Sequence, residues 1–325
     1  MRTAVIALAL VPALVASAQA PPTHGLDWVT VGAPGNRPTL PSEAPWHAEP
    51  IGAVDQEFRI TRTPVTAAQW VEFVTAYAPY VDPSVQSDSA FTSLFVDFVS
   101  GGPSPRYEVK PGKDRFPVDP AWHYAATFAN WLHNGKSPER WAFENGAYDI
   151  STFYVRPDGT RADQRERSPG ARFFLPNLDE WTKAVYYDTD RYAPDEGGYY
   201  LYPGSEDPLV TGPPGDPGAE TSAGLGTLLP VGQYPHSTTP WGLLDTSGGL
   251  FEWVEDPYRD DGKNRRLVSS SAGSDPSLED RIDLRWFRLP PDLPGVGFRV
   301  AAVVPAPGTA VLLVLGVLIL RRRKQ

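Results

Sequence analysis

Proline and glycine occupy one position in five of this chain, and no other feature limits its regular structure as strongly. The 325 residues include 36 Pro and 29 Gly. Proline breaks helix interiors and removes a hydrogen bond from a strand, and glycine weakens both elements. The chain also carries 10 Trp, 14 Tyr and 14 Phe, whereas disordered chains are poor in aromatic residues. A folded but loop-rich protein is therefore expected.

The absence of cysteine and the acidic composition exclude several classes of function. The chain has no Cys, so disulfides, thiolate metal sites and cysteine nucleophiles are ruled out. Its 39 Asp and Glu outnumber its 29 Lys and Arg, and the formal charge is −10. This balance argues against a general nucleic-acid binder, so no nucleic-acid partner is expected.

The N-terminal 20 residues have the pattern of a secretory signal peptide. Arg2 precedes an apolar run over 4–15, and small residues at 18–20 supply a cleavage site. Two prolines follow at once and would end a helix. A buried N-terminal helix, the alternative, fits these prolines less well. Residues 1–20 are thus predicted to direct export.

The C-terminal segment 304–325 resembles a PEP-CTERM sorting signal of bacterial envelopes. A Pro-rich start leads into an apolar run over 309–320 and then into basic residues at 321–324. The apolar run is shorter than the roughly 20 residues that span a bilayer, and the family usually has Glu where Ala306 stands. The resemblance implies an exported protein of the bacterial cell envelope, surface or extracellular matrix. Its C-terminus would contact the membrane and the sorting machinery, or serve as a plain anchor.

Three helices are predicted from start signals and apolar spacing. Thr66 begins a capping box before a stripe of apolar residues at i, i+3, i+4 and i+7. The second helix is expected to have Asp119 as its N-cap and Pro120 as its first residue. The third is expected to begin after Asn177, with Glu180 completing a capping box.

The remaining elements are expected to be short strands separated by long irregular segments. Runs rich in β-branched and aromatic residues and bounded by turn residues predict strands, at 27–31, 57–61, 171–175 and 297–303. Dense Pro, Gly, Asp and Ser over 78–118 and 189–240 predict loops. Helices and strands do not alternate regularly, so the expected fold class is α+β.

Six segments, in order, resemble the formylglycine-generating enzyme (sulfatase-modifying factor) family. They share with that family its opening strand, its entry to the first helix, its W-x-x-A-x-x-F-x-x-W element, its R-L-P-T-E-A-E-W element, its G-N-V-W-E-W turn and its closing G-F-R. In this chain the segments lie at 26–32, 58–66, 116–132, 171–181, 241–253 and 297–300. The resemblance implies one domain over 26–303, with a loop-rich variant of the C-type lectin fold.

The same resemblance implies that the oxidase chemistry is missing. Oxidases of the family bind copper through a cysteine pair before the closing G-F-R, and between Arg266 and Arg299 this chain has neither Cys nor His. Copper and formylglycine-generating activity are therefore not expected. The family's G-N-V-W-E-W turn contributes to a calcium site. Gly249 replaces its Asn, but Glu252 keeps its position and is predicted as a calcium ligand.

One acidic and aromatic segment lies where the family builds its substrate groove. Its residues Asp275, Asp283, Arg285, Trp286 and Phe287 are therefore predicted to bind a ligand. A salt-bridged surface segment is the alternative interpretation. No residue is predicted to be catalytic.

Three functions remain open, because a fold alone does not give a function. The favoured one is a non-catalytic recognition or structural module for an extracellular glycan, peptide or surface protein. The second is an enzyme of different, cysteine-independent chemistry, which would place an Asp or Glu of perturbed pKa in a pocket. The third is a pseudoenzyme partner of an active paralogue, which would show a large apolar patch.

Overall fold

The computed structural model describes most of the chain between the two predicted targeting segments. Its described residues are 20–47, 49–82, 91–100, 106–157, 161–257, 265–268, 275–284, 287–288 and 295–304, with 161, 265–268 and 287–288 described for their backbone alone. Pro21–Val303 form one compact unit. Apart from residues 20 and 304, the predicted signal peptide and sorting segment lie outside the described residues. Within the described part, every helix is too short or too polar to cross a membrane.

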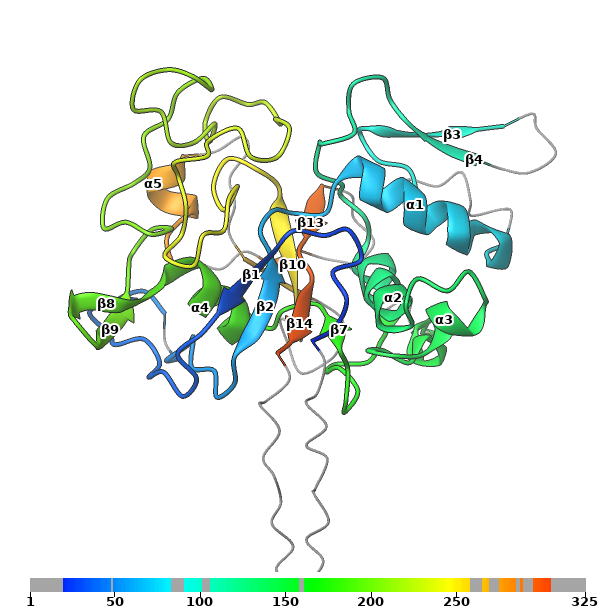
Figure 1. Cartoon of the computed structure of the whole chain (residues 1–325), viewed down its shortest axis with the longest axis horizontal. Helices are drawn as coiled ribbons and strands as arrows, with labels where there is room; N and C mark the ends of the chain where they lie inside the picture. Colours follow the sequence, from blue (N-terminus) through cyan, green and yellow to red (C-terminus); the bar gives the residue numbers. More distant parts are fainter. Residues whose placement is uncertain are drawn as a thin grey trace, which may run out of the picture. The chain divides into compact units, whose positions relative to one another are not determined.

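Helices and strands are short, in agreement with the proline and glycine content (Figure 1). The helices are α1 (Ala67–Tyr77), α2 (Trp122–His133), α3 (Trp141–Glu144), α4 (Leu178–Tyr186) and α5 (Pro276–Glu279), with 3-10 turns η1 (Ala78–Tyr80) and η2 (Ile150–Thr152). The strands are β1 (Trp28–Val31), β2 (Phe58–Thr61), β3 (Val96–Val99), β4 (Arg106–Val109), β5 (Tyr154–Val155), β6 (Arg161–Ala162), β7 (Phe173–Phe174), β8 (Tyr187–Ala193), β9 (Glu196–Tyr199), β10 (Phe251–Pro257), β11 (Arg265–Val268), β12 (Phe287–Arg288), β13 (Val296–Phe298) and β14 (Ala301–Val303). The predicted α+β class is confirmed.

Two four-stranded sheets form the framework. One has the order β1-β2-β14-β7 and is antiparallel throughout. The other has the order β12-β11-β10-β13, with β13 parallel to β10. The sequence predicted one strand over 297–303, and the structure has two. The chain leaves one sheet and enters the other at Arg299 and Val300, so this short step joins the two sheets.

Two of the three predicted helix starts are confirmed and one is wrong. α1 begins after Thr66 and α4 after Asn177, both with the capping box formed. α2 begins at Trp122, with Ala121 as its N-cap. Asp119 lies two residues before this N-cap, and its carboxylate instead accepts a hydrogen bond from the Gly295 amide, 3.0 Å away, just before β13. A long-range contact thus replaces the local one.

The core also contains a buried acidic residue on β10. Glu255 accepts a hydrogen bond from the Tyr148 hydroxyl at 2.9 Å and one from the Arg167 amide at 2.8 Å. The Arg167 guanidinium lies between Glu255 and Glu180, at 3.3 Å and 2.6 Å. Burial raises the pKa of Glu255 to about 7, although the positive charge of Arg167 opposes this.

This pKa predicts a pH dependence of stability. Folding raises the pKa of Glu255 from 4.5 to about 7, so the folded chain binds the proton more tightly than the unfolded chain does. The stabilisation is complete below pH 4.5 and is lost as the pH rises through 7, by at most about 3 kcal/mol. Glu255→Gln should remove this dependence, which urea unfolding of both proteins from pH 4.5 to 7.5 measures. Parallel pH profiles of the two proteins would refute the assignment.

Candidate functional site

A shallow hollow, open to solvent, lies over the turn at 245–249 that leads into β10. Its wall combines prolines and aliphatic side chains with hydroxyl, amide and carboxyl groups. The lining residues are Pro64, Pro117, Ser222, Leu229, Pro230, Val231, Gln233, Tyr234, Asp245, Ser247, Gly248 and Gly249. A smaller hollow shares Tyr234, Asp245 and Ser247 with it and adds Glu220, Ser237 and Thr246. The two form one polar site with an apolar wall.

Asp245 is the most unusual residue of this site. Its backbone has φ 56°, in the left-handed region that few residues other than glycine adopt. Both carboxylate oxygens accept from the Gly232 amide, at 2.8 and 3.1 Å. Burial raises the pKa of the carboxyl, although the charge of Arg299 opposes this. A strained backbone and a raised pKa in one hollow are typical of functional sites.

The hydroxyl groups beside Asp245 are held in fixed positions. The Ser247 hydroxyl donates to the buried Asp280 and lies 2.7 Å from the hydroxyl of Thr221. Ser222 donates to the Gly248 carbonyl at 3.0 Å. A Cβ at Gly248 would lie 2.7 Å from the Thr221 hydroxyl oxygen, and φ there is +77°. The turn therefore requires glycine at this position.

A buried ion pair stabilises the turn at 245–249. Arg299 and Glu252 are both fully buried, and the Arg299 Nε lies 2.9 Å from Glu252 Oε1. Glu252 also accepts from the Trp181 indole at 2.7 Å. The remaining guanidinium N–H groups donate to backbone carbonyls at the end of β2 and at the start of the turn, those of Thr61, Arg62, Leu244 and Asp245. One arginine thus holds the Asp245 turn against the neighbouring sheet.

In this environment Glu252 has a structural role. Its carboxylate neutralises Arg299 and accepts the Trp181 indole N–H, and its predicted role as a calcium ligand stays a prediction. Across the described ranges, no three His, Asp or Glu side chains are grouped so as to hold a metal ion.

Asp275 and Asp283, the two predicted ligand-binding residues whose side chains the structure describes, do not line the hollow. Asp275 caps α5 by accepting from the Ser277 amide, and Asp283 pairs with Arg281. Phe287 begins β12. Arg285 and Trp286 lie outside the described residues. Their predicted role is therefore untested.

The sequence prediction missed Asp245 and Ser247. Both lie in the segment 241–253 that carries part of the family resemblance, in which the sequence pointed to Gly249 and Glu252 instead. A signal was present, because Asp245 lies in a glycine-rich turn, and Asp is one of the few residues that tolerate the left-handed backbone. Ser222 and Tyr234, which lie beside the turn, come from a loop that is distant in sequence. No local sequence pattern predicts where that loop lies in the fold.

Comparison with known proteins agrees with this architecture. The family model described as the sulfatase-modifying factor enzyme 1-like domain (FGE-sulfatase) matches residues 29–302. Treponema denticola variable protein 1 is a similar solved structure, with 17% identity, a TM-score of 0.53, and 85% of this chain and 95% of that chain covered. CarF is another, with 20% identity, a TM-score of 0.50, and 86% and 99% covered. No curated protein sequence matched. Because the family model spans most of the chain, this protein belongs to the sulfatase-modifying factor (FGE-sulfatase) family.

Proposed function

We propose that this protein is an exported recognition module of the bacterial cell envelope that binds an extracellular glycan without altering it. The signal-peptide pattern at 1–20 and the PEP-CTERM-like pattern at 304–325 support export. The absence of cysteine removes the copper ligands of the family's oxidases. What remains of the family architecture is a scaffold with a polar hollow.

The mixed lining of the hollow over 245–249 is the observation that carries the proposal. Asp245, Ser247 and Gln233 present polar groups beside the ring of Tyr234 and the proline walls. A sugar offers hydroxyl groups to such polar groups and C–H groups to an apolar wall, so both kinds of surface have a counterpart. The acidic chain disfavours anionic polymers. A neutral glycan therefore fits better than an acidic peptide.

Binding to the cell-surface polysaccharide of the source organism tests this function. The full chain should bind it saturably, and Asp245→Asn should weaken binding about tenfold, the loss of one hydrogen bond to a charged acceptor. Asn tolerates the same backbone conformation, so the fold is kept. Asp207→Asn, which changes an exposed carboxylate outside the hollow, is the matched control. Absence of saturable binding, or equal binding by the Asp245 variant, would overturn the proposal.

The same titration, repeated with excess chelator and then with added calcium, tests the predicted role of Glu252. Calcium-dependent binding that needs a higher calcium concentration in Glu252→Asp, a shorter carboxylate, would support a metal site there. Equal affinity with and without calcium would show that the chain binds the polysaccharide without calcium.

A second function is favoured by one observation, the carboxyl groups of Asp245 and Glu220 that both line the smaller hollow. Glycoside hydrolysis uses two carboxyl groups, one that gives a proton to the leaving oxygen and one that activates the attacking water. Hydrolysis would release reducing ends from the bound polysaccharide. Reducing ends produced by the wild type and lost in Asp245→Asn would replace recognition by catalysis.

A further inference from the structure

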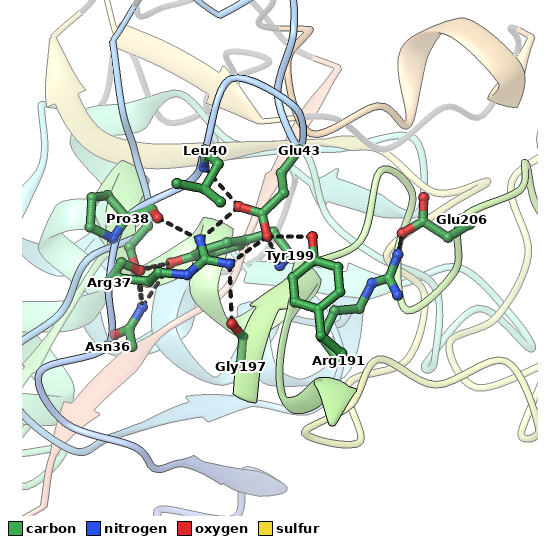
Figure 2. Close-up of polar contacts among 11 residues, drawn as sticks. Asn36, Arg37, Pro38, Leu40, Glu43, Arg191, Gly197, Tyr199 and Glu206 are labelled. Carbon is green, nitrogen blue, oxygen red and sulfur yellow. Dashed lines mark hydrogen bonds and ion pairs between the residues drawn. The ribbon is translucent and has the colours of Figure 1, made fainter. Parts of the chain in front are cut away.

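The long connection between β1 and β2 is fixed against the β8–β9 hairpin at Glu43. The side chain of Glu43 is 2% exposed and accepts two hydrogen bonds from the Arg37 guanidinium, both at 2.7 Å. It also accepts from the Leu40 and Tyr199 amides and from the Tyr192 hydroxyl, at 2.7, 3.0 and 2.9 Å. Figure 2 shows Arg37 and Leu40 donating to this carboxylate. The loop is therefore ordered by five hydrogen bonds to one buried group.

The same loop is fixed a second time at Trp46. The Trp46 amide donates to Asp283 at 3.0 Å, and Arg281 forms two bonds to Asp283, at 2.9 and 2.8 Å. The Arg281 guanidinium lies 3.7 Å from the centroid of the Trp46 ring. Backbone and ring are both fixed by the segment that follows α5.

Trp46 nevertheless presents most of its surface to water. Its exposed fraction is 60%, the largest among the exposed apolar side chains of the described residues. Arg281 covers one ring face, which leaves the other face available. The same loop forms a shallow hollow with residues on both sides of Trp46 in the sequence, lined by Thr39, Leu40, Pro41, Ala44, His47, Glu49 and Pro50.

A fixed, exposed indole on a loop that also forms a small hollow is suited to a ligand that needs one flat surface. The loop is already ordered, so binding loses little conformational entropy there. A stable protein interface buries about 800 Å² on each partner and needs several anchors, whereas Leu40, 45% exposed, is the other large exposed apolar side chain of this loop. The Arg281–Asp283 pair is neutral as a unit. The small exposed apolar area and the neutral ion pair both favour a ligand with a single uncharged ring.

We propose that Trp46, backed by Arg281, is a stacking platform for a neutral pyranose ring of a polysaccharide. It is a second subsite, separate from the hollow at Asp245, and it rests on the proposed glycan-binding function. A pyranose with equatorial hydroxyls presents a face of C–H groups, which packs on the electron-rich face of an indole. Leu40 and His47, in the wall of the hollow that the same loop forms, would lie beside the next part of the chain.

Calorimetric titration of the full chain with cellohexaose and chitohexaose, two neutral β-linked hexasaccharides, tests the platform. At least one should bind saturably, and Trp46→Ala should weaken that binding about tenfold or more, which corresponds to about 1.4 kcal/mol. Trp46→Phe keeps a flat ring and should retain most of the affinity. Trp141→Ala is the matched control, because Trp141 is 55% exposed on a different element, α3, and should bind as the wild type does.

The outcomes separate this subsite from the proposed function. Hexasaccharides that do not bind, or that bind equally to wild type and Trp46→Ala, overturn the platform. If the envelope polysaccharide is still bound through Asp245, recognition stands without it. If Asp245→Asn binds normally and Trp46→Ala does not, the platform stands and the hollow at Asp245 is not the recognition site.

Discussion

Replacing Glu252 with Gln is expected to lower the free energy of unfolding by about 3–5 kcal/mol. The substitution leaves the Arg299 guanidinium, which is fully buried, without a compensating charge. Breaking a buried pair by removing one partner has this cost because the remaining charge can neither reach water nor find a new partner. Denaturant unfolding of the two proteins at the same pH measures the difference.

An exposed ion pair provides the control for this prediction. Arg106 and Glu108 lie 2.9 Å apart with side chains 66% and 52% exposed, so Glu108→Gln should change stability by about 1 kcal/mol or less. A similarly small effect of Glu252→Gln would contradict the assignment of a buried ion pair.

The double replacement Glu252→Leu with Arg299→Leu should not restore stability. An apolar pair often substitutes for a buried ion pair without loss. Here, however, Arg299 also donates to four backbone carbonyls, including those of Leu244 and Asp245. Removing it takes a donor from each of these carbonyls. The Arg62 carbonyl keeps the Leu244 amide at 2.9 Å, whereas each buried acceptor that loses its donor costs about 1–3 kcal/mol. A double variant as stable as the wild type would show that these bonds are dispensable.

Replacing Trp70 with Ala is expected to destabilise the fold by about 3–5 kcal/mol, the usual cost of truncating a buried aromatic residue. Trp70 on α1 is fully buried and contacts Phe73, Phe128 on α2 and Phe298 on β13, with ring centroids 5.0, 6.2 and 6.1 Å apart. It therefore joins both long helices to a strand of the second sheet. Its indole N–H also donates to the Phe91 carbonyl at 3.1 Å, which would lose its partner.

Trp141→Ala serves as the control here too, because Trp141 is 55% exposed. It should change stability by about 1 kcal/mol or less, while Trp70→Ala shifts the denaturation midpoint clearly. Equal shifts for the two variants would mean that the aromatic contacts of Trp70 do not hold the helices on the sheet.

Local sequence patterns predicted the structure correctly where both interacting residues lie within one helical turn of each other. The capping boxes at Thr66 and Asn177 each join residues three positions apart, so the sequence is enough to find them. Asp119 shows the limit. Its position before Pro120 has the form of a cap, but the Gly295 amide, 176 positions away, takes its carboxylate. A local signal cannot reveal a competing partner so distant in sequence.

The sequence by itself determined the class of this protein. Proline and glycine shortened its elements, six ordered segments identified the family, and the missing cysteines predict that the copper centre of its oxidases is absent. Only the tertiary structure placed the two surfaces that we propose as ligand-binding sites. Arg299 reaches the Thr61 carbonyl across 238 positions, and Trp46 reaches Asp283 across 237. Such contacts depend on how loops meet after folding, so the hollow at Asp245 and the exposed face of Trp46 exist only in the folded chain.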